Sequence, residues 1–466
     1  MDELRPLDAA FLEIEDAEPQ SALAIASIAV VDGPPPAQHE IVAAYAALLP
    51  LVPRYRQRVR RVPLDLGPPV WADDPEFDPH RHFERIALPA PGNEDALCDL
   101  IGLIMAERMD RTRPLWQCWV IEGLPEGRWA LLSKVHHCLA DGVSGNSLHE
   151  VFFRAGPAPP AAPWQPGDDP GSLALLGSAV RRLVTGPATE LPVLARTLLS
   201  PARLARRVTN AARGLTALSA ALVPAASSSL SGPVGGDRHY ELAHATLSEV
   251  LAISRYFRVT VNDVALAAIS GAFRTVLLDR GENPAPDAVR SLVPVSVRAT
   301  STVDNQISLL LPVLPVDLPG PVERLTAVHR RLAALKREKE AEAGLTATTT
   351  AAHGPFPPLG WGIRAAAKLP QRNITTVTTN VPGPAHRLSL LGREVVGLYP
   401  YVPIAVRLRT GIAILTYAGR LTFGITADLA TAPKAGLLAG SIEQELGLLR
   451  HLAISGHPAP GAASEK

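Results

Sequence analysis

A stretch rich in Pro and Ala divides the sequence into two parts, each of which alternates strand-like and helix-like segments. The stretch covers residues 155–235, begins with AGPAPPAAPWQPGDDPGS, and has a linker composition that is too rich in Pro to hold one packed structure. Before it, hydrophobic periodicity predicts strands over residues 22–31 and 129–135 and helices over residues 41–49 and 94–108. After it, the pattern predicts helices over residues 261–278 and 323–342 and strands over residues 293–297, 307–313, 374–379, 411–417 and 421–426.

This alternation indicates a mixed α/β (α+β) fold built as two lobes joined by a long linker. The length of 466 residues suits two or three domains of roughly 150 residues each. We expect an N-terminal lobe over residues 1–154, a linker over residues 155–237, a C-terminal lobe over residues 238–455 and a disordered tail over residues 456–466.

The charge balance and the cysteine content argue against several classes of protein. There are 45 Lys and Arg residues against 45 Asp and Glu, a formal net charge of zero that argues against a nucleic-acid-binding protein. Aromatic residues make up only 5% of the chain, so a base-stacking surface is not expected either. Cys98, Cys118 and Cys138 form no C-x-x-C pair, so we expect neither a disulfide framework nor a structural zinc site.

The N-terminus and the apolar runs predict a cytoplasmic location. The first twenty residues are acidic where a signal peptide would be basic and then apolar, and the apolar run over residues 21–31 is too short to span a bilayer. Residues 181–213 contain seven Arg and only one acidic residue, Glu190, and from residue 201 one helical face is apolar and the other basic. Such a helix could lie on an anionic membrane or lipid-droplet surface, or pack as a solvated helix between two domains.

The most informative local feature is a predicted strand that runs directly into two histidines. Alternation along the strand over residues 129–135 sends the following His136 and His137 to opposite faces, so one imidazole can face a cavity while the other packs inside. Asp141-Gly142 is a turn signal, and residues 143–154 are predicted as the helix that follows it. A carboxylate placed four residues after an imidazole can support the local geometry or fix a tautomer.

A neutral histidine at such a place suits general-base catalysis, because its ordinary pKa of about 6.5 matches proton transfer near neutral pH. The simpler alternative is two ordinary histidines at the end of a strand. A metal site is not expected, since imidazoles that point apart do not readily bind one ion and no third ligand stands at a recognisable spacing.

Other catalytic classes lack their motifs. The sequence contains no G-x-S-x-G nucleophile motif, no phosphate-binding G-x-x-x-x-G-K-[ST] loop, and no G-x-G-x-x-G fingerprint after a strand. A covalent mechanism through Cys138 is disfavoured, because a neighbour of His137 on a strand points away from it. The pattern therefore favours a base that activates a hydroxyl or amine of the substrate itself.

The sequence resembles a known family over nearly its whole length, from residue 5 to about residue 428. Residues 136–142, HHCLADG, are similar to the HHxxxDG motif of the acyl-CoA-dependent acyltransferases related to chloramphenicol acetyltransferase. PLDAAFL at residues 6–12 and RPLW at residues 113–116 resemble motifs of the bacterial wax ester synthase/diacylglycerol acyltransferase family. In the same order, residues 261–264, 294–298 and 380–384 resemble the ND, PVS-R and NVPGP motifs of that family.

This resemblance implies two chloramphenicol-acetyltransferase-like lobes with a tunnel between them. By position in the motifs, His137 would be the proton acceptor, His136 would support the site, and Asp141, followed by Gly142, would hold the motif loop. Asn262 and Asp263 would line or brace the site from the second lobe, and Arg298 belongs to the PVS-R element. The resemblance implies acyl-CoA as a substrate and no metal or redox cofactor.

Three functions follow from the resemblance. The first is transfer of a long-chain acyl group from acyl-CoA to diacylglycerol, forming triacylglycerol. The second is wax ester synthesis on a fatty alcohol, or acylation of another lipid hydroxyl. The third is a non-enzymatic membrane-surface protein that binds acyl lipids.

Some positions differ from the usual pattern of the family. Ser231 precedes the Gly-Pro pair at residues 232–233 where many members have Asn, and Asp304 stands where Gly is usual. Residues 404–411 read IAVRLRTG, whereas relatives tend to be acidic and rich in Gly there. These differences all fall in the second half of the chain, away from the histidine pair.

Overall fold

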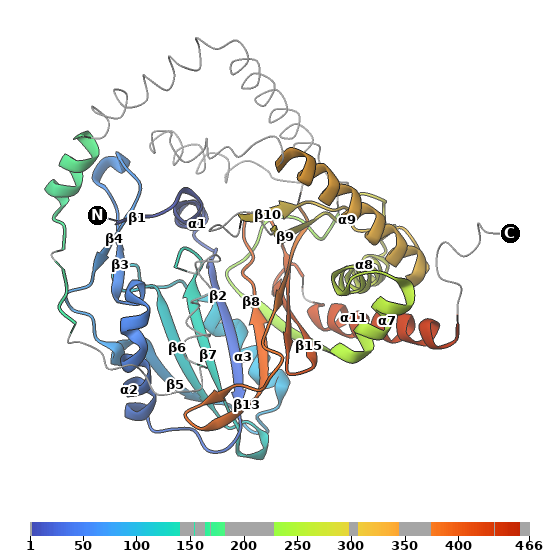
Figure 1. Cartoon of the computed structure of the whole chain (residues 1–466), viewed down its shortest axis with the longest axis horizontal. Helices are drawn as coiled ribbons and strands as arrows, with labels where there is room; N and C mark the ends of the chain where they lie inside the picture. The colour runs from blue at the N-terminus through green and yellow to red at the C-terminus, as the bar shows by residue number, and fades with distance from the viewer. Residues whose placement is uncertain are drawn as a thin grey trace, which may run out of the picture.

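The computed structural model describes residues 2–139, 153, 164–167, 169–181, 228–297, 306–343, 374–432 and 434–456. These residues form two six-stranded sheets with helices packed on them, together with a small three-stranded sheet near the N-terminus (Figure 1). The expected mixed α/β architecture with two lobes is therefore present. Short 3-10 helices connect elements of the N-terminal half: η1 Leu49–Leu51, η2 Pro53–Arg56, η3 Pro63–Asp65, η4 Pro79–His82 and η5 Pro125–Gly127.

The first sheet has the strand order β12-β13-β2-β7-β6-β5. Its strands are β12 Ser389–Leu390, β13 Arg393–Tyr401, β2 Ala24–Val31, β7 Trp129–His136, β6 Trp116–Glu122 and β5 Phe83–Ala87. The helices α1 Pro6–Ala17, α2 Gln38–Leu48 and α3 Glu94–Ala106 share its apolar core. Every residue of β7 is buried, so the strand that leads to the histidines is a central element of this lobe.

Two strands of the first sheet come from the far half of the chain. β13 pairs antiparallel with β2, with Leu398 opposite Ala29, so residues 389–401 cross over from the second lobe. The Tyr240 hydroxyl of β8 donates to the Pro400 carbonyl at 2.8 Å, and a Cβ on Gly424 of β15 would lie 1.9 Å from the same oxygen. The two sheets thus meet at this crossing, which a division into consecutive segments does not anticipate.

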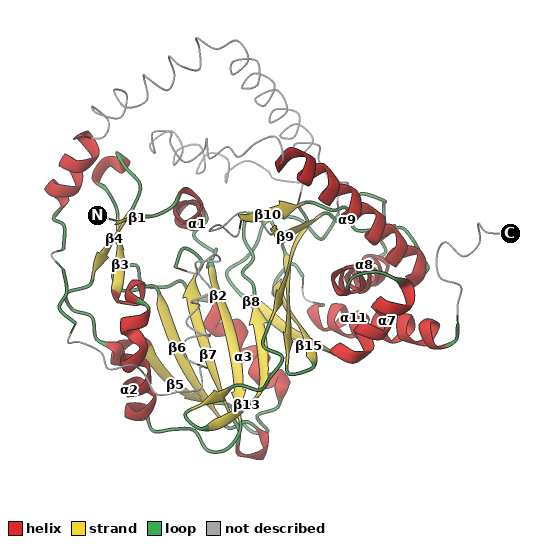
Figure 2. Cartoon of the chain, in the orientation of Figure 1, coloured by secondary structure: helices red, strands yellow, loops and turns green. Residues whose placement is uncertain are grey.

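The second sheet has the strand order β10-β9-β11-β14-β15-β8. Its strands are β8 Arg238–Thr246, β9 Ser291–Val297, β10 Gln306–Leu310, β11 Thr376–Pro382, β14 Thr410–Tyr417 and β15 Arg420–Asp428. Its helices α7 Leu247–Phe257, α8 Val261–Asp279, α9 Pro321–Ala343 and α11 Ala435–Ile454 gather on one side of it, as Figure 2 shows in red.

Helix α8 is the core helix of this second lobe. Within the described part of the chain, it alone is long and apolar enough to cross a membrane by length and composition, but 72% of that window is buried inside the protein. A helix that is apolar on all sides is expected where it is enclosed on all sides. Burial among α7, α9, α11 and the sheet accounts for its composition.

Part of the stretch expected to act as a linker is packed. The small sheet has the order β1-β4-β3, with β1 Asp2–Glu3, β4 Val70–Asp73 and β3 Gln57–Arg60. Asp169 pairs with Arg58 of β3 at 2.7 Å, and helix Ser172–Arg181 buries Leu175 and Ala179. The Pro-rich sequence does not predict these contacts, because their partners lie on a sheet that is distant in sequence. Apart from Arg181, the basic stretch at residues 181–213 lies outside the described residues.

The close approach at Gly424 leads to a stability prediction. In Gly424→Ala, the added methyl group must displace the Pro400 carbonyl, so we expect the free energy of unfolding to fall by about 2 kcal/mol or more. Urea unfolding at pH 7 measures this effect. The matched control is Gly440→Ala in α11, where a Cβ meets nothing within 4 Å and a gain of about 0.5–1 kcal/mol is expected. Equal stability of the two variants would contradict the close crossing.

Candidate active site

Backbone hydrogen bonds hold the histidine pair at the end of β7. His136 is the last residue of the strand, opposite Ala24 of β2, and its side chain is buried. The His136 amide donates to the Leu115 carbonyl at 3.0 Å, and the His137 amide donates to the Leu23 carbonyl at 3.0 Å. His137 is therefore anchored by its backbone just beyond the end of β7.

The neighbours of the His136 ring determine its tautomer. The Cys138 amide donates to Nδ1 of His136 at 3.2 Å, and because an amide can only donate, Nδ1 must be the unprotonated nitrogen. The proton of the neutral ring is therefore on Nε2. This atom lies 3.5 Å from Oε2 of Glu15, at the outer limit of a hydrogen bond, so the contact is mainly electrostatic.

Glu15 is a buried carboxylate on α1 that sequence reasoning did not identify. Its Oε1 accepts from the Leu23 amide at 3.0 Å, and its Oε2 accepts from Nη2 of Arg111 at 2.5 Å. Burial by itself raises the pKa of Glu15, but the interactions with His136, Arg111 and the Leu23 amide outweigh burial and hold this pKa well below its usual range. Glu15 is therefore ionised at neutral pH.

His137 is held as a neutral imidazole. Its ring stacks on Phe11 of α1, with the ring centroids 3.8 Å apart and the planes 23° from parallel. Burial lowers the pKa of His137 to about 4, because removal from water disfavours the charged ring. Its Nδ1 is buried without a hydrogen-bond partner in the described part of the chain. The ring is thus in its proton-accepting form at neutral pH.

Helix α1 connects the two histidines. Phe11 and Glu15 are four residues apart and so lie on the same face of the helix, one against His137 and the other against His136. The sequence signal was an acidic residue within the apolar pattern of residues 6–17, but it does not reveal which partner the helix covers.

Cys138 is unsuited to be a nucleophile. Its thiol is buried, with Sγ 3.0 Å from Nδ1 of His136, and burial raises the pKa of this thiol well above its usual range. Because the thiolate is the reactive form, a protonated buried thiol is inert.

In the second lobe, Asp263 has a structural role. Its carboxylate accepts from the Thr260 amide at 2.9 Å and closes a capping box at the start of α8. The same Oδ2 lies 2.9 Å from Nδ1 of His329 on α9. Asn262 accepts a hydrogen bond from Nδ2 of Asn380 at 3.2 Å, so the ND and NVPGP motifs meet at this point.

Three expected site residues, Asp141, Gly142 and Arg298, lie outside the described residues. The described residues contain no group of three or more His, Cys, Asp or Glu arranged to hold a metal ion. Trp116 of the RPLW element is fully buried and donates from its indole to the Tyr55 carbonyl at 2.8 Å, which is a packing role.

Two of the unusual sequence positions contact one another. Ser231 forms a β-bridge with Leu408, and the Gly232 amide donates to the Arg407 carbonyl at 3.1 Å. Nη1 of Arg409 donates to the Ser229 carbonyl at 2.7 Å. The two segments that differ from the family pattern, residues 229–232 and 404–411, therefore pack against each other.

Comparison with known proteins decides the family. The model of the wax ester synthase/diacylglycerol acyltransferase catalytic domain matches residues 4–265, and that of the WS/DGAT C-terminal domain matches residues 303–450. The chain belongs to this family. It is 43% identical over 452 residues to the probable diacylglycerol O-acyltransferase tgs1 of Mycobacterium tuberculosis (strain ATCC 25618 / H37Rv), covering 96% of each chain.

Solved structures agree with this assignment. The wax ester synthase/diacylglycerol acyltransferase from Marinobacter aquaeolei VT8 matches with a TM-score of 0.67 at 25% identity, covering 97% of this chain and 100% of that one. A mutant starter condensation domain of rhizomide synthetase, in complex with C8-CoA, matches with a TM-score of 0.54 at 15% identity, covering 97% and 95%. At that identity, the second likeness shows the fold alone.

The ionised Glu15 leads to a prediction about stability and pH. In Glu15→Gln, Arg111 and His136 lose a buried charge partner, so we expect the free energy of unfolding to fall by about 3 kcal/mol at pH 7. The loss should shrink below about pH 4.5, because the unfolded wild-type chain then takes up a proton that native Glu15 refuses. Urea unfolding at several pH values measures both effects. A loss that stays constant with pH would show that the charge of Glu15 contributes nothing.

Proposed function

We propose that this protein is an acyl-CoA-dependent O-acyltransferase that transfers a long-chain acyl group to the hydroxyl of diacylglycerol, forming triacylglycerol, with His137 as the general base. Membership of the family and the name of the 43% identical relative support the reaction. The observation that carries the role of His137 is its neutral ring, which stacks on Phe11 at the end of β7.

The reaction needs one proton acceptor and no protein nucleophile. His137 takes the proton of the acceptor hydroxyl while that oxygen attacks the thioester carbonyl. The tetrahedral intermediate then expels the CoA sulfur, breaking the carbon–sulfur bond, and the proton on His137 passes to the thiolate. A thiol with a pKa of about 8.5 leaves easily, so the demanding step is activation of the alcohol. Acyl-CoA is a substrate in this scheme, and no metal or redox cofactor takes part.

His136, Glu15 and Arg111 act behind the base. Since Cys138 fixes Nδ1 of His136 as an acceptor, Glu15 faces the protonated Nε2 and holds the ring in one orientation. His136 and Glu15 are then positioning residues for the loop that carries His137. We propose that Asp141 and Gly142 hold the same loop and that Asn262, Asp263 and Arg298 brace the site from the second lobe. The bond between Asn262 and Asn380 supports this arrangement for Asn262.

A second candidate reaction is wax ester synthesis from a fatty alcohol. It is favoured by the names of the matching family model and of the Marinobacter structure, both of which include this activity. The same base serves either acceptor, so product identity separates the two reactions. Because the acceptors are lipids, we also propose that the protein works in the cytoplasm at the surface of a membrane or lipid droplet.

Thiol release from palmitoyl-CoA tests the proposal, with dioleoylglycerol or hexadecanol as the acceptor. His137→Ala should lower the rate by roughly 10²–10⁴-fold, because it removes the proton acceptor. The matched control is His39→Gln, which alters an exposed histidine on α2 and should leave the rate within about twofold of wild type. Full activity of a folded His137→Ala variant would remove His137 as the base. A wild-type protein that binds acyl lipids but releases no thiol with either acceptor would favour a lipid-binding role.

A further inference from the structure

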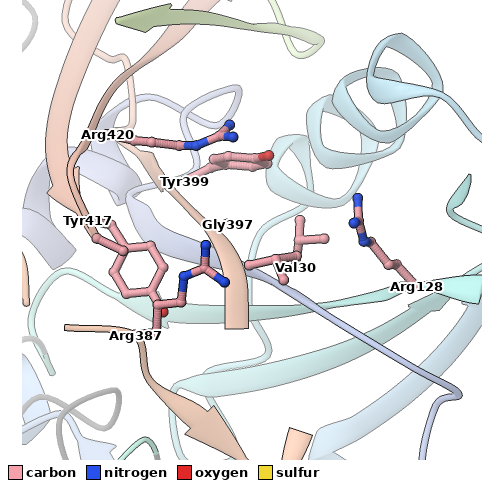
Figure 3. A pocket seen from close by; sticks show the side chains of 9 residues that line it. Val30, Arg128, Arg387, Gly397, Tyr399, Tyr417 and Arg420 are labelled. Carbon is pink, nitrogen blue, oxygen red and sulfur yellow. The ribbon is translucent and has the colours of Figure 1, made fainter. Parts of the chain in front are cut away.

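A pocket of about 260 Å³ lies at the opposite end of β2 and β7 from the histidines. Both lobes and the crossing strand contribute to its wall: Val30 and Arg128 from the first lobe, Gly397 and Tyr399 from β13, and Tyr417 and Arg420 from the β14–β15 hairpin. Figure 3 shows the guanidinium groups of Arg128, Arg387 and Arg420 around the space next to Gly397 and Val30. A ligand here would contact both lobes at once.

The lining of the pocket is cationic. It includes three arginines and no carboxylate. Arg128 pairs with Glu126 at 2.5 Å and with Asp32 at 3.5 Å, and Arg387 pairs with Glu394, but none of these carboxylates lines the pocket. Among the described residues, the side chain of Arg420 makes no ion pair or hydrogen bond; its charge acts on Tyr399, which also lines the pocket. The Tyr417 hydroxyl already donates to the Val395 carbonyl at 2.7 Å, so the pocket offers an unpaired guanidinium, two further guanidinium groups and Tyr399. Such a group of donors favours an anion with several oxygen acceptors.

The local backbone geometry sets the positions of Arg420 and Tyr399 in the pocket. Ala418 and Gly419 both have positive φ values, 45° and 81°, which form the tight turn that presents Arg420 at the first position of β15. On the facing wall, the pairing of β13 with β2 shifts register between Val395 and Gly397. Such irregularities re-aim side chains, and here the strand directs Tyr399 into the pocket.

The position of the pocket suits one end of a long substrate. Val30 pairs with Ala130, and His136 lies six residues further along β7, which is ~20 Å at the rise of a strand. Acyl-CoA carries its thioester at one end and its phosphates at the other, with the pantetheine arm between them. A volume of about 260 Å³ is just below the usual range for a complete ligand, so it suits a phosphate and its immediate surroundings.

We propose that Arg420, Arg387 and Arg128 form a phosphate-binding site, and that the phosphate is that of the nucleotide end of acyl-CoA. The choice of acyl-CoA rests on the proposed function. The same chemistry would bind the phosphate of an anionic phospholipid, so the experiment must distinguish these two sources.

Calorimetric titration of the full-length protein with CoA and with 3′-dephospho-CoA tests the site without turnover. In Arg420→Gln, we expect the Kd for CoA to rise at least about tenfold, and the preference of the wild type for CoA over 3′-dephospho-CoA to shrink toward one. Arg387→Gln should act in the same direction. Arg393→Gln is the matched control, since Arg393 begins β13 but does not line the pocket, and its Kd should stay within about twofold of wild type.

Vesicles of phosphatidylglycerol and of phosphatidylcholine form the second arm. If Arg420→Gln weakens partition onto phosphatidylglycerol but leaves the Kd for CoA unchanged, the phosphate site stands and a lipid is its source. If Arg420→Gln matches wild type with both probes, or the wild type binds neither, the site is refuted. Binding of CoA that depends on Arg420, without any acyl transfer by the wild type, would refute the proposed function and leave the site intact.

Discussion

The ion pair between buried Glu15 and half-buried Arg111 is the interaction on which the histidine site depends. This ion pair joins α1 to the segment that follows α3. The Glu15 carboxylate also accepts a hydrogen bond from the Leu23 amide and faces the ring of His136. A buried carboxylate without such partners would take up a proton instead of remaining charged. With them, one charge on α1 holds the start of β2 and the end of β7 together, and Phe11 covers His137 from the same helix.

The second constraint is the crossing of the two lobes. β13 completes the sheet that carries the histidines, although it belongs to the C-terminal half of the chain. The Pro400 carbonyl accepts a hydrogen bond from the Tyr240 hydroxyl and leaves no room for a side chain at Gly424. The two lobes are therefore closely packed where β13 crosses between them. Gly397 and Tyr399 of the crossing strand also form one wall of the pocket that is lined by three arginines. Chemistry at one end of β7 and recognition at the other would then share a single rigid strand.

Local patterns predicted the parts of the molecule that depend on neighbours in sequence. Alternation over residues 129–135 predicted a strand that the structure ends at His136, and the apolar period over residues 261–278 predicted α8. The remaining features depend on distant partners. Nothing near Glu15 indicates that it faces His136, and nothing near residues 393–401 indicates pairing with β2. Helix Ser172–Arg181 was missed because the surrounding Pro-rich composition outweighed its own short apolar pattern.

The central claim is that burial keeps His137 neutral so that it can accept a proton. The most direct measurement is an NMR titration of the His137 ring, combined with the pH dependence of kcat/KM for palmitoyl-CoA. We predict that the ring titrates near pH 4 and that the acid limb of kcat/KM follows the same ionisation, so that activity persists well below pH 6. A ring that titrates at its ordinary pKa of about 6.5, or an acid limb that does not follow His137, would contradict the account.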